Sequence, residues 1–302
     1  MGTKQPSLLV TKASGTTVPF SAEKIRQSLR KSGARPDVIE TVLDELYRQI
    51  YPNIPTRMIY KIAYGLLKRK AKAVAGKYHL KQAIFELGPS GFPFEQYVAE
   101  LFRQQEFTAT TNEILEGHCV KHEVDILAVR NKVSNIIECK YHHQQGAFCD
   151  IKIPLYVESR FRDIEWQWKN THEKTQQQCE AWLITNTRFS TDATQYAACM
   201  GLHLMSWDFP TGGGLKDIIY QAGLYPVTCI TTLTKGEKSR LLERGIVLCK
   251  TLAAHPSYLE ESGIAASRKD LVMAEVENLC QEFTTSPISK KEPQVISVKP
   301  SA

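Results

Sequence analysis

The hydrophobic and polar positions of the first 90 residues predict two short strands followed by helices. Apolar and polar residues alternate over residues 8–12 and 17–20, on either side of a turn. Beyond Ser21, a favourable N-cap residue, apolar residues recur at helical spacing. Four helices are predicted here. Three begin at Ala22, after Pro36 and after Thr56, and the fourth covers Tyr78–Phe85.

A second pattern begins after the breaker cluster at residues 88–91 (GPSG). Apolar runs typical of strands alternate with helical patterns, which favours an α/β domain with a mixed sheet. The predicted elements are a helix at Phe94–Gln104, strands at Glu123–Val129 and Asn135–Tyr141, a strand at Ala181–Thr185, a helix at Ala193–Met200 and a strand at Leu202–Trp207.

The remaining chain predicts a third domain and a tail. The glycine run at residues 212–214 is typical of a flexible linker, and the pattern after it is helical throughout. The last segment is polar and contains prolines, which favours disorder. We therefore expect an α+β multidomain protein with a mainly helical first domain, an α/β second domain and an all-α third domain. The expected ranges are 1–88, 89–210, 211–283 and a tail at 284–302.

Composition narrows the class of protein. The 302 residues are 42% hydrophobic and 23% charged, which is ordinary for a globular protein. The net charge of +6 and the pI of about 8.8 suit a polyanionic partner such as nucleic acid. No apolar run is long enough for a membrane helix, and eight single cysteines without a signal peptide indicate a cytoplasmic location.

Two predicted strands carry a constellation of charged side chains, Asp125 on the first and Glu138 and Lys140 on the second. Glu138 and Lys140 are two residues apart, so they share a face of their strand. A turn of two residues at 131–132 would place Asp125 opposite Glu138, whereas a turn of four would place it opposite Lys140. Either turn puts all three on one face.

Such a face is suited to phosphodiester hydrolysis. Two carboxylates can hold Mg²⁺ or Mn²⁺, which stabilises charge on the phosphoryl group, and the backbone carbonyl of Cys139 could add a ligand. Lys140 could orient the attacking water. A surface ladder of ion pairs is the alternative. The apolar neighbours of Asp125 and Glu138 favour the metal site, because a charge is costly to bury there without a partner.

These residues resemble a known superfamily. The segments GFPFEQYVAELFRQQEF, HEVDILAV and IIECKY, together with WLITNTRFSTDATQYAACMGLHLMSWD, look like a PD-(D/E)xK nuclease domain of the Mrr-like, restriction endonuclease-like branch. The resemblance implies that Asp125 is the metal aspartate, that Glu138 and Lys140 form the E-x-K pair, and that Glu95 is the glutamate of the first helix. A zinc site built from the nearby histidines and cysteines is a competing interpretation, although their spacing matches no standard pattern.

The first domain resembles an ATP-cone, a nucleotide-binding regulatory domain. The resemblance rests on LLVTKASGTTVPFSAEKIRQSL, NIPTRMIYKIAYGLL and YHLKQAIFEL. It implies that Lys12 and Lys24 bind the phosphates of ATP or dATP and that Tyr60 lies beside the nucleotide. One basic residue of the usual pattern is missing, because Ala13 follows Lys12. A small helical DNA-binding domain is the alternative.

The C-terminal segment resembles a helix-hairpin-helix domain more loosely, with turns at residues 241–245 and 262–264, and a dimerising helical bundle is nearly as well supported. Together these patterns predict a metal-dependent DNA endonuclease controlled by a purine nucleotide, acting in restriction or DNA repair. A homodimer is the expected assembly. Two other functions remain open. One is a nucleotide-sensing DNA-binding protein without catalysis, and the other is a structure-specific or RNA-directed nuclease.

Overall fold

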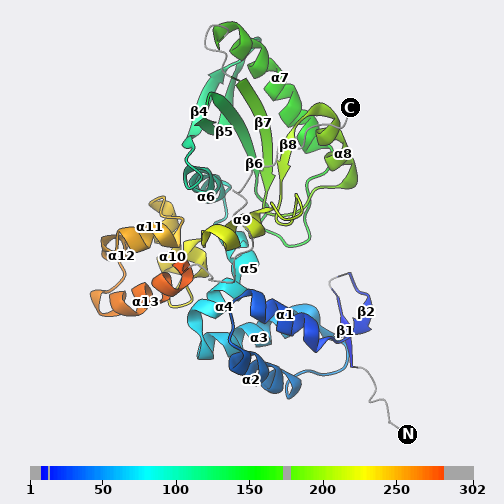
Figure 1. Ribbon diagram of the computed structural model, residues 1–302, viewed down its shortest axis with the longest axis vertical. Coiled ribbons are helices and arrows are strands. Elements are labelled where there is room, and N and C mark those ends of the chain that lie inside the picture. The colour runs from blue at the N-terminus through cyan, green and yellow to red at the C-terminus, as the bar shows by residue number, and fades with distance from the viewer. Residues whose placement is uncertain (1–7, 13, 173–177, 282–302) are drawn as a thin grey trace.

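The computed structural model describes residues 8–12, 14–172 and 178–281 (Figure 1). The tail predicted at 284–302 lies outside these residues. The described chain forms a small N-terminal sheet with helices around it, a five-stranded sheet with helices on both faces, and a C-terminal group of helices. It is a mixed α+β chain of several parts, as the sequence predicted.

The N-terminal part confirms the predicted hairpin and the first three helices. β1 pairs antiparallel with β2 and parallel with β3. The side chain of Ser21 accepts a hydrogen bond from the backbone N–H of Lys24, so the predicted N-cap is present. The elements are β1 (Leu9–Thr11), β2 (Thr17–Pro19), α1 (Ala22–Lys31), α2 (Pro36–Tyr47), β3 (Ile54–Pro55) and α3 (Thr56–Lys70).

The predicted fourth helix is divided in two. α4 (Lys72–Tyr78) begins earlier than expected, and α5 (Leu80–Phe85) follows after a single residue, His79. The two helices also pack in different cores. Ala75 belongs to the core of the N-terminal part, whereas Leu80, Ala83 and Ile84 belong to the large core that continues into the rest of the molecule.

The five-stranded sheet has the order β4-β5-β6-β7-β8. β4, β5 and β6 are antiparallel neighbours, and β7 and β8 continue parallel to β6. α6 packs on one face, and α7 and α8 pack on the other (Figure 1). The elements are α6 (Phe92–Arg103), β4 (Thr108–Glu116), β5 (Lys121–Arg130), β6 (Val133–Lys140), α7 (Lys152–His172), β7 (Gln178–Thr185), α8 (Thr191–Met200) and β8 (His203–Met205).

Two elements of this part were not predicted, the edge strand β4 and the long helix α7. β4 alternates exposed and half-buried residues and is rich in threonine, so its apolar signal is weak. α7 carries charged residues around most of its surface, and several of them form ion pairs along the helix. Helical periodicity is hard to detect where both faces contain charges.

The C-terminal part follows without a flexible linker. Gly214 is buried, and a Cβ placed on it would lie 2.9 Å from the backbone nitrogen of Phe209. The linker prediction was wrong for this reason: the glycine permits close packing of the chain on itself, and Leu215 N–H then donates to the carbonyl of Ser206. The elements are α9 (Leu215–Ala222), η2 (Val227–Cys229), α10 (Lys235–Glu243), α11 (Cys249–Ala254), α12 (Ser257–Glu261), η3 (Ala266–Arg268) and α13 (Lys269–Cys280).

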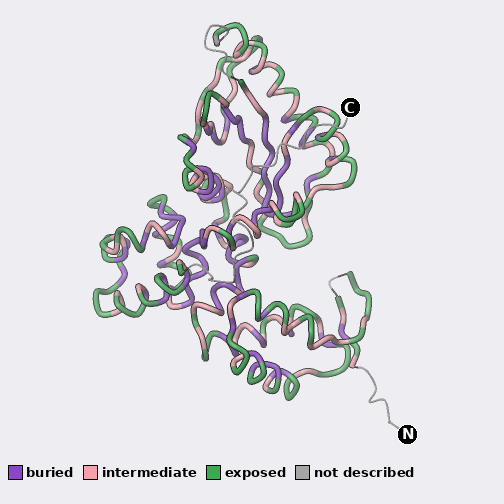
Figure 2. Tube along the Cα trace, in the orientation of Figure 1, coloured by how far each residue is buried: buried purple, intermediate pink, exposed green. Residues whose placement is uncertain are grey.

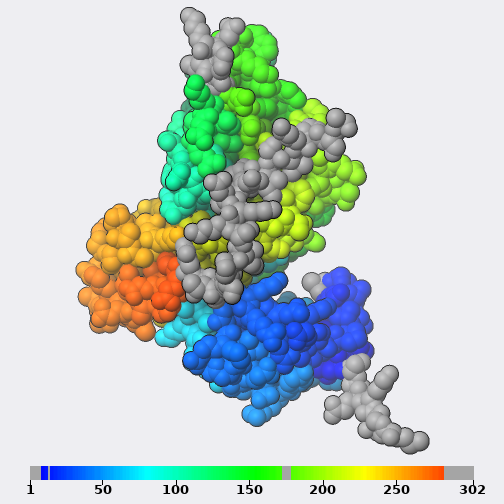
Figure 3. Space-filling view, in the orientation of Figure 1, coloured from blue at the N-terminus to red at the C-terminus, as the bar shows by residue number. Residues whose placement is uncertain are grey.

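One hydrophobic core joins the sheet to the C-terminal helices. It contains residues from α5 and α6, from the α6 face of the sheet and from every C-terminal α-helix, and the buried segments converge around α5 in Figure 2. α13 also packs against α4, so the C-terminal helices and the N-terminal part lie side by side (Figure 3). Among the described residues, no helix combines the length and the apolar character needed to cross a lipid bilayer.

Candidate functional site

The β5–β6 hairpin fixes the relative positions of the predicted catalytic residues. Arg130 pairs with Val133, so the turn consists of two residues, Asn131 and Lys132, and both have positive φ, 50° and 64°. This is the type I′ geometry that matches the twist of paired strands. The structure thus selects the shorter of the two turns that the sequence allowed.

Asp125 lies where the β5–β6 ladder stops. The last backbone pair is Ile126 with Ile137, and the same register continued by one residue sets Asp125 opposite Glu138. Here the Asp125 carboxylate replaces the backbone acceptor: the N–H of Cys139 donates to its Oδ2 at 2.6 Å. The N–H and C=O of a strand residue point to the same neighbour, so the Cys139 carbonyl also faces Asp125. The Cys139 side chain packs against the large core, which leaves the carbonyl as its possible ligand.

Glu138 and Lys140, two residues apart on β6, share one face of that strand. Arg160 of α7 donates from Nη1 to Glu138 Oε2 at 2.8 Å, and its other terminal nitrogen donates to the carbonyl of Glu123. The Lys140 side chain is exposed, while its carbonyl accepts from Thr185 Oγ1 at 2.6 Å in the neighbouring strand. The charge of Lys140 acts to lower the pKa of both Asp125 and Glu138, against the larger opposing effect of burial.

Glu95 reaches the same site from the first turn of α6. A Cβ on Gly91 would lie 3.0 Å from Glu95 Oε1, so the glycine leaves room for this carboxyl group. Burial, followed by the charges of Asp125 and Glu138, raises the pKa of Glu95 to about 7. The charges of Asp125 and Glu138 therefore act on Glu95, and its catalytic role stays a prediction of the resemblance.

The other two carboxyl groups are also destabilised in their charged form. Burial and then the charge of Asp125 raise the pKa of Glu138 to about 7, although Arg160 acts in the opposite direction. Burial raises the pKa of Asp125, against the hydrogen bond from Cys139 and the charge of Arg160. Three acidic groups are therefore held together at a cost, which is typical of sites that bind a cation or handle protons.

The donor atoms suit a hard divalent cation, but they are not arranged around one. The carboxylates of Asp125 and Glu138 and the carbonyl of Cys139 are the oxygen ligands that Mg²⁺ prefers. Within the described residues, no three His, Cys, Asp or Glu side chains are grouped to hold a metal ion. The guanidinium of Arg160 instead provides a positive charge at Glu138. The same finding leaves the alternative zinc site without a ligand cluster, since His122 pairs with Asp163 and His142 contacts Cys149.

Sequence reasoning missed Arg160. Its helix was not predicted, and Arg160 lies among other charged residues in a segment (ESRFRDIEW) that reads as a solvated surface. Arg160 can be identified only when the packing of α7 is known as well as the sequence. Once α7 is known to cover the Glu138 face of the sheet, an arginine on that helix is the expected counter-ion for a buried glutamate.

The predicted nucleotide-binding residues come from three different elements or their ends. Lys12 follows β1 and Lys24 lies on α1, and both are exposed. Tyr60 lies on α3 and stacks against Tyr64 and Tyr78. Its contacts are thus with α3, α4 and the residue between α4 and α5, rather than with the two lysines.

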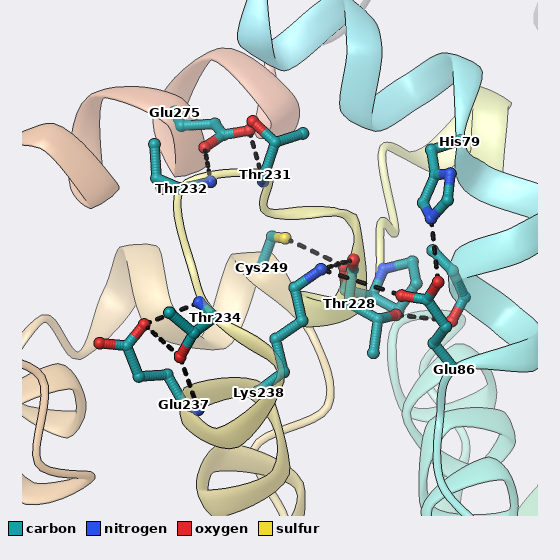
Figure 4. Close-up of polar contacts among 12 residues, drawn as sticks. His79, Glu86, Thr228, Thr231, Thr232, Thr234, Glu237, Lys238, Cys249 and Glu275 are labelled. Carbon is teal, nitrogen blue, oxygen red and sulfur yellow. Dashed lines mark hydrogen bonds and ion pairs between the residues drawn. The ribbon is translucent and has the colours of Figure 1, made fainter. Parts of the chain in front are cut away.

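Tyr60 begins a chain of polar contacts that leaves the N-terminal part. Its hydroxyl lies 2.6 Å from His79 Nδ1, and His79 Nε2 lies 3.2 Å from Glu86 Oε1. The other carboxylate oxygen of Glu86 is 3.9 Å from Lys238 Nζ on α10, and Lys238 donates to the Thr228 carbonyl at 2.6 Å (Figure 4). We call this series the Tyr60–Lys238 chain. It connects α3 to the C-terminal helices.

The C-terminal end of α5, next to Glu86, is hydrogen-bonded to the residue that follows β6. The Tyr141 hydroxyl donates to the carbonyl of Phe85 at 2.7 Å, and the rings of Tyr141 and Phe94 lie 5.5 Å apart. Phe85 ends α5 and is adjacent to Glu86 in the sequence. The Tyr60–Lys238 chain and the candidate catalytic strand therefore meet at the C-terminal end of α5.

Two family models match this chain. Residues 8–82 match the ATP cone domain, so the N-terminal part is an ATP-cone, and this supports nucleotide binding there. Residues 225–280 match the family described as AF1548-like, C-terminal.

Two relatives cover the larger part of the chain. An uncharacterized protein of Archaeoglobus fulgidus is 33% identical over 183 residues, which make up 60% of this chain and 99% of that protein. A solved structure titled as a protein of unknown function, AF1548, is 30% identical with a TM-score of 0.53, and the match covers 63% of this chain and 98% of that one. The chain belongs to the family of the Archaeoglobus protein.

The C-terminal turns differ from what the looser helix-hairpin-helix resemblance implied. Both turns are present, with Gly245 and Gly263 at φ 73°. However, the N–H of Gly245 donates to Leu242 and that of Gly263 donates to Glu260. The N–H groups of Ile246 and Ile264 are likewise bonded within the chain. These turns therefore do not offer free N–H donors to a DNA phosphate in this conformation.

Proposed function

We propose that the protein is a metal-dependent DNA endonuclease of the PD-(D/E)xK, Mrr-like class, using Mg²⁺ or Mn²⁺. The element order supports it: a helix with Glu95, a strand with Asp125, a strand with Glu138 and Lys140, and then a strand, a helix and a strand. This is the arrangement that the sequence resemblance implies. The observation that carries the proposal is the crowding of Asp125, Glu138 and Lys140 on neighbouring strands with Glu95 of α6.

Each residue has a role that follows from its position. Asp125, Glu138 and the Cys139 carbonyl would hold the cation, which would stabilise negative charge on the phosphoryl group. Lys140 is exposed on the same face, where its ammonium can orient a water molecule and balance phosphate charge. Glu95, with a pKa of about 7, can exchange a proton near neutral pH.

The substrate follows from the charge of the molecule and from the class. A net charge of +6 favours a polyanion, and phosphate contacts of lysines and arginines supply affinity without sequence preference. We propose duplex DNA as the substrate. An RNA or a branched DNA would use the same catalytic groups, so a panel of substrates must separate these possibilities.

We further propose that ATP or dATP in the ATP-cone controls the cleavage. The support is the Tyr60–Lys238 chain, because it leads from the tyrosine that the resemblance places beside the nucleotide to the helix on which Tyr141 is anchored. Calorimetry with ATP and dATP tests the binding step. Lys24→Ala should weaken the affinity about tenfold through loss of a phosphate contact. No heat with either nucleotide would make the ATP-cone a purely structural module.

The catalytic proposal is tested with supercoiled plasmid, MgCl₂ and the full chain. Wild type should nick or linearise the plasmid, EDTA should stop it, and Lys140→Ala should remove the activity. Lys132→Ala is the matched control, because Lys132 is an exposed lysine in the turn of the same hairpin. Intact plasmid with wild type, or equal cleavage by Lys140→Ala, would refute the assignment. Salt-sensitive DNA binding without cleavage would identify a non-catalytic DNA-binding protein.

A further inference from the structure

Arg160 contacts the candidate site although it is not one of its acidic groups. It projects from the middle of α7 onto the sheet, and 16% of its side chain is exposed. Its two terminal nitrogens donate to a carboxylate oxygen of Glu138 and to the backbone carbonyl of Glu123. The guanidinium therefore bridges β6 and β5, through Glu138 on one strand and Glu123 on the other.

The atoms around this guanidinium are of the kind that a metal ion would use. Carboxylate and backbone carbonyl oxygens are the ligands preferred by hard divalent cations, and they are also good acceptors for arginine. In the described structure, Glu138 thus has a cationic partner without a metal. A divalent cation that takes Glu138 as a ligand must compete with Arg160 for the same carboxylate.

We propose that Arg160 is a built-in counter-ion, which neutralises Glu138 in the metal-free protein and is displaced from it when a divalent cation binds. This inference rests on the proposed metal site and adds a regulation of that site. Arg160 is a positioning residue in this scheme, because it acts through Glu138. It lowers the cation affinity and prevents Glu138 from being left as an unpaired buried charge.

The guanidinium also makes a contact that does not depend on Glu138. The Arg160 guanidinium carbon lies 5.4 Å from the centroid of the Tyr156 ring, and Tyr156 is 60% exposed. A cation–π contact with this ring can hold the guanidinium after Glu138 is released. In that position it would remain beside the candidate site, available to a phosphate oxygen of the substrate.

The test measures cation binding rather than cleavage. Mn²⁺ is titrated calorimetrically into the full chain without DNA, at the same pH of 8.5 for every variant. Arg160→Gln should bind Mn²⁺ about tenfold more tightly than wild type, because the competing charge-assisted hydrogen bond is gone. Arg160→Lys should give a smaller gain and serves as a second variant if the glutamine protein does not fold.

Arg162→Gln is the matched control. Arg162 lies on the same helix, but it pairs with Glu158 and Glu165 and is 53% exposed. It removes the same charge from the helix, so its affinity for Mn²⁺ should stay within about twofold of wild type. Equal affinity in wild type and both Arg160 variants would overturn the counter-ion while leaving the metal site intact. Absence of Mn²⁺ binding in wild type and in every variant would overturn both proposals.

Discussion

Two half-buried glutamates of this protein show opposite electrostatics. The side chains of Glu138 and Glu86 are exposed to similar extents, 25% and 32%. The pKa of Glu138 is raised to about 7, by burial and then by Asp125. Burial also acts to raise the pKa of Glu86, but the hydrogen bond and charge of His79, together with Lys238, bring it below its ordinary value. Because the two glutamates are buried to a similar extent, the neighbouring charged groups decide whether the pKa is raised or lowered.

This difference in pKa distinguishes a structural residue, Glu86, from a residue of the candidate site, Glu138. Glu86 is compensated by residues of the chain itself, and its contacts hold α5 against the C-terminal helices. Around Glu138 the acidic groups outnumber the basic ones, since Asp125 and Glu95 add to its charge and only part is offset by Arg160 and Lys140. An excess of negative charge that the fold does not neutralise is what an external cation can stabilise.

The largest expected effect is on cleavage. Asp125→Asn should lower the rate of plasmid cleavage by at least about a thousandfold, roughly 4 kcal/mol of barrier, because it removes a charged ligand for the cation. Glu86→Gln should stay within about tenfold of wild type, because Glu86 takes no part in the chemistry. Initial rates over a range of MgCl₂ concentrations measure both. A Glu86→Gln defect as large as that of Asp125→Asn would remove the distinction between the two regions.

The next effect is on stability. Glu86→Gln should lower the midpoint of thermal unfolding by about 5 °C at pH 7.5, because His79 and Lys238 lose their anionic partner, at a cost of roughly 1–3 kcal/mol. Glu260→Gln is the control, since Glu260 pairs with Lys269 and is 50% exposed. It should change the midpoint by less than about 1 °C. Scanning calorimetry of the two variants beside wild type decides whether Glu86 is structural.

Removing the charge of Glu95, in the candidate site, should stabilise the protein, whereas removing that of Glu86 should destabilise it. Because the pKa of Glu95 is about 7 in the folded protein and near 4.5 in the unfolded chain, the folded state binds the extra proton between these values. Stability contributed by Glu95 therefore falls as the pH rises through this window. Glu95→Gln should raise the unfolding midpoint by about 2–4 °C at pH 8.5 without metal.

Two conditions sharpen this test. At pH 5 the advantage of Glu95→Gln should nearly vanish, because the folded protein then holds Glu95 protonated. At pH 8.5 saturating Mn²⁺ should reduce it, because the cation offsets the same charge. A destabilised Glu95→Gln at pH 8.5 would show that the carboxylate has a stabilising partner that the present geometry lacks.

The sequence predicted what depends on neighbours along the chain. The position of the turn at Asn131–Lys132 could be predicted because asparagine tolerates positive φ and the strands on both sides are apolar. Its length, two or four residues, was left open by the sequence and is settled by the pairing of Arg130 with Val133. The N-cap at Ser21 likewise depends on neighbours along the chain. Arg160 was not predictable in this way, because its partner is 22 residues away and meets it only when α7 packs on the sheet.

The glycine run at residues 212–214 is a second case in which the local sequence did not determine the structure. Its composition is typical of a linker, yet Gly214 is buried against the backbone of Asp208 and Phe209. A glycine is compatible both with a mobile segment and with close approach of two chain segments, and only packing distinguishes them. Likewise, the Tyr60–Lys238 chain unites residues separated by more than half of the sequence, so no local pattern reveals it.

The smallest expected effect concerns communication between the two regions. His79→Ala breaks the Tyr60–Lys238 chain while leaving Lys12 and Lys24 untouched, so ATP should bind with an affinity within a few-fold of wild type. In wild type, ATP should change the amide hydrogen exchange of residues 225–240, and His79→Ala should reduce that change by about threefold or more. Lys24→Ala provides the contrast, because it should lose the exchange effect only in proportion to weaker ATP binding. An undiminished effect in His79→Ala would mean that coupling passes through other contacts, such as the packing of α4 against α13, which also joins the ATP-cone to the C-terminal helices.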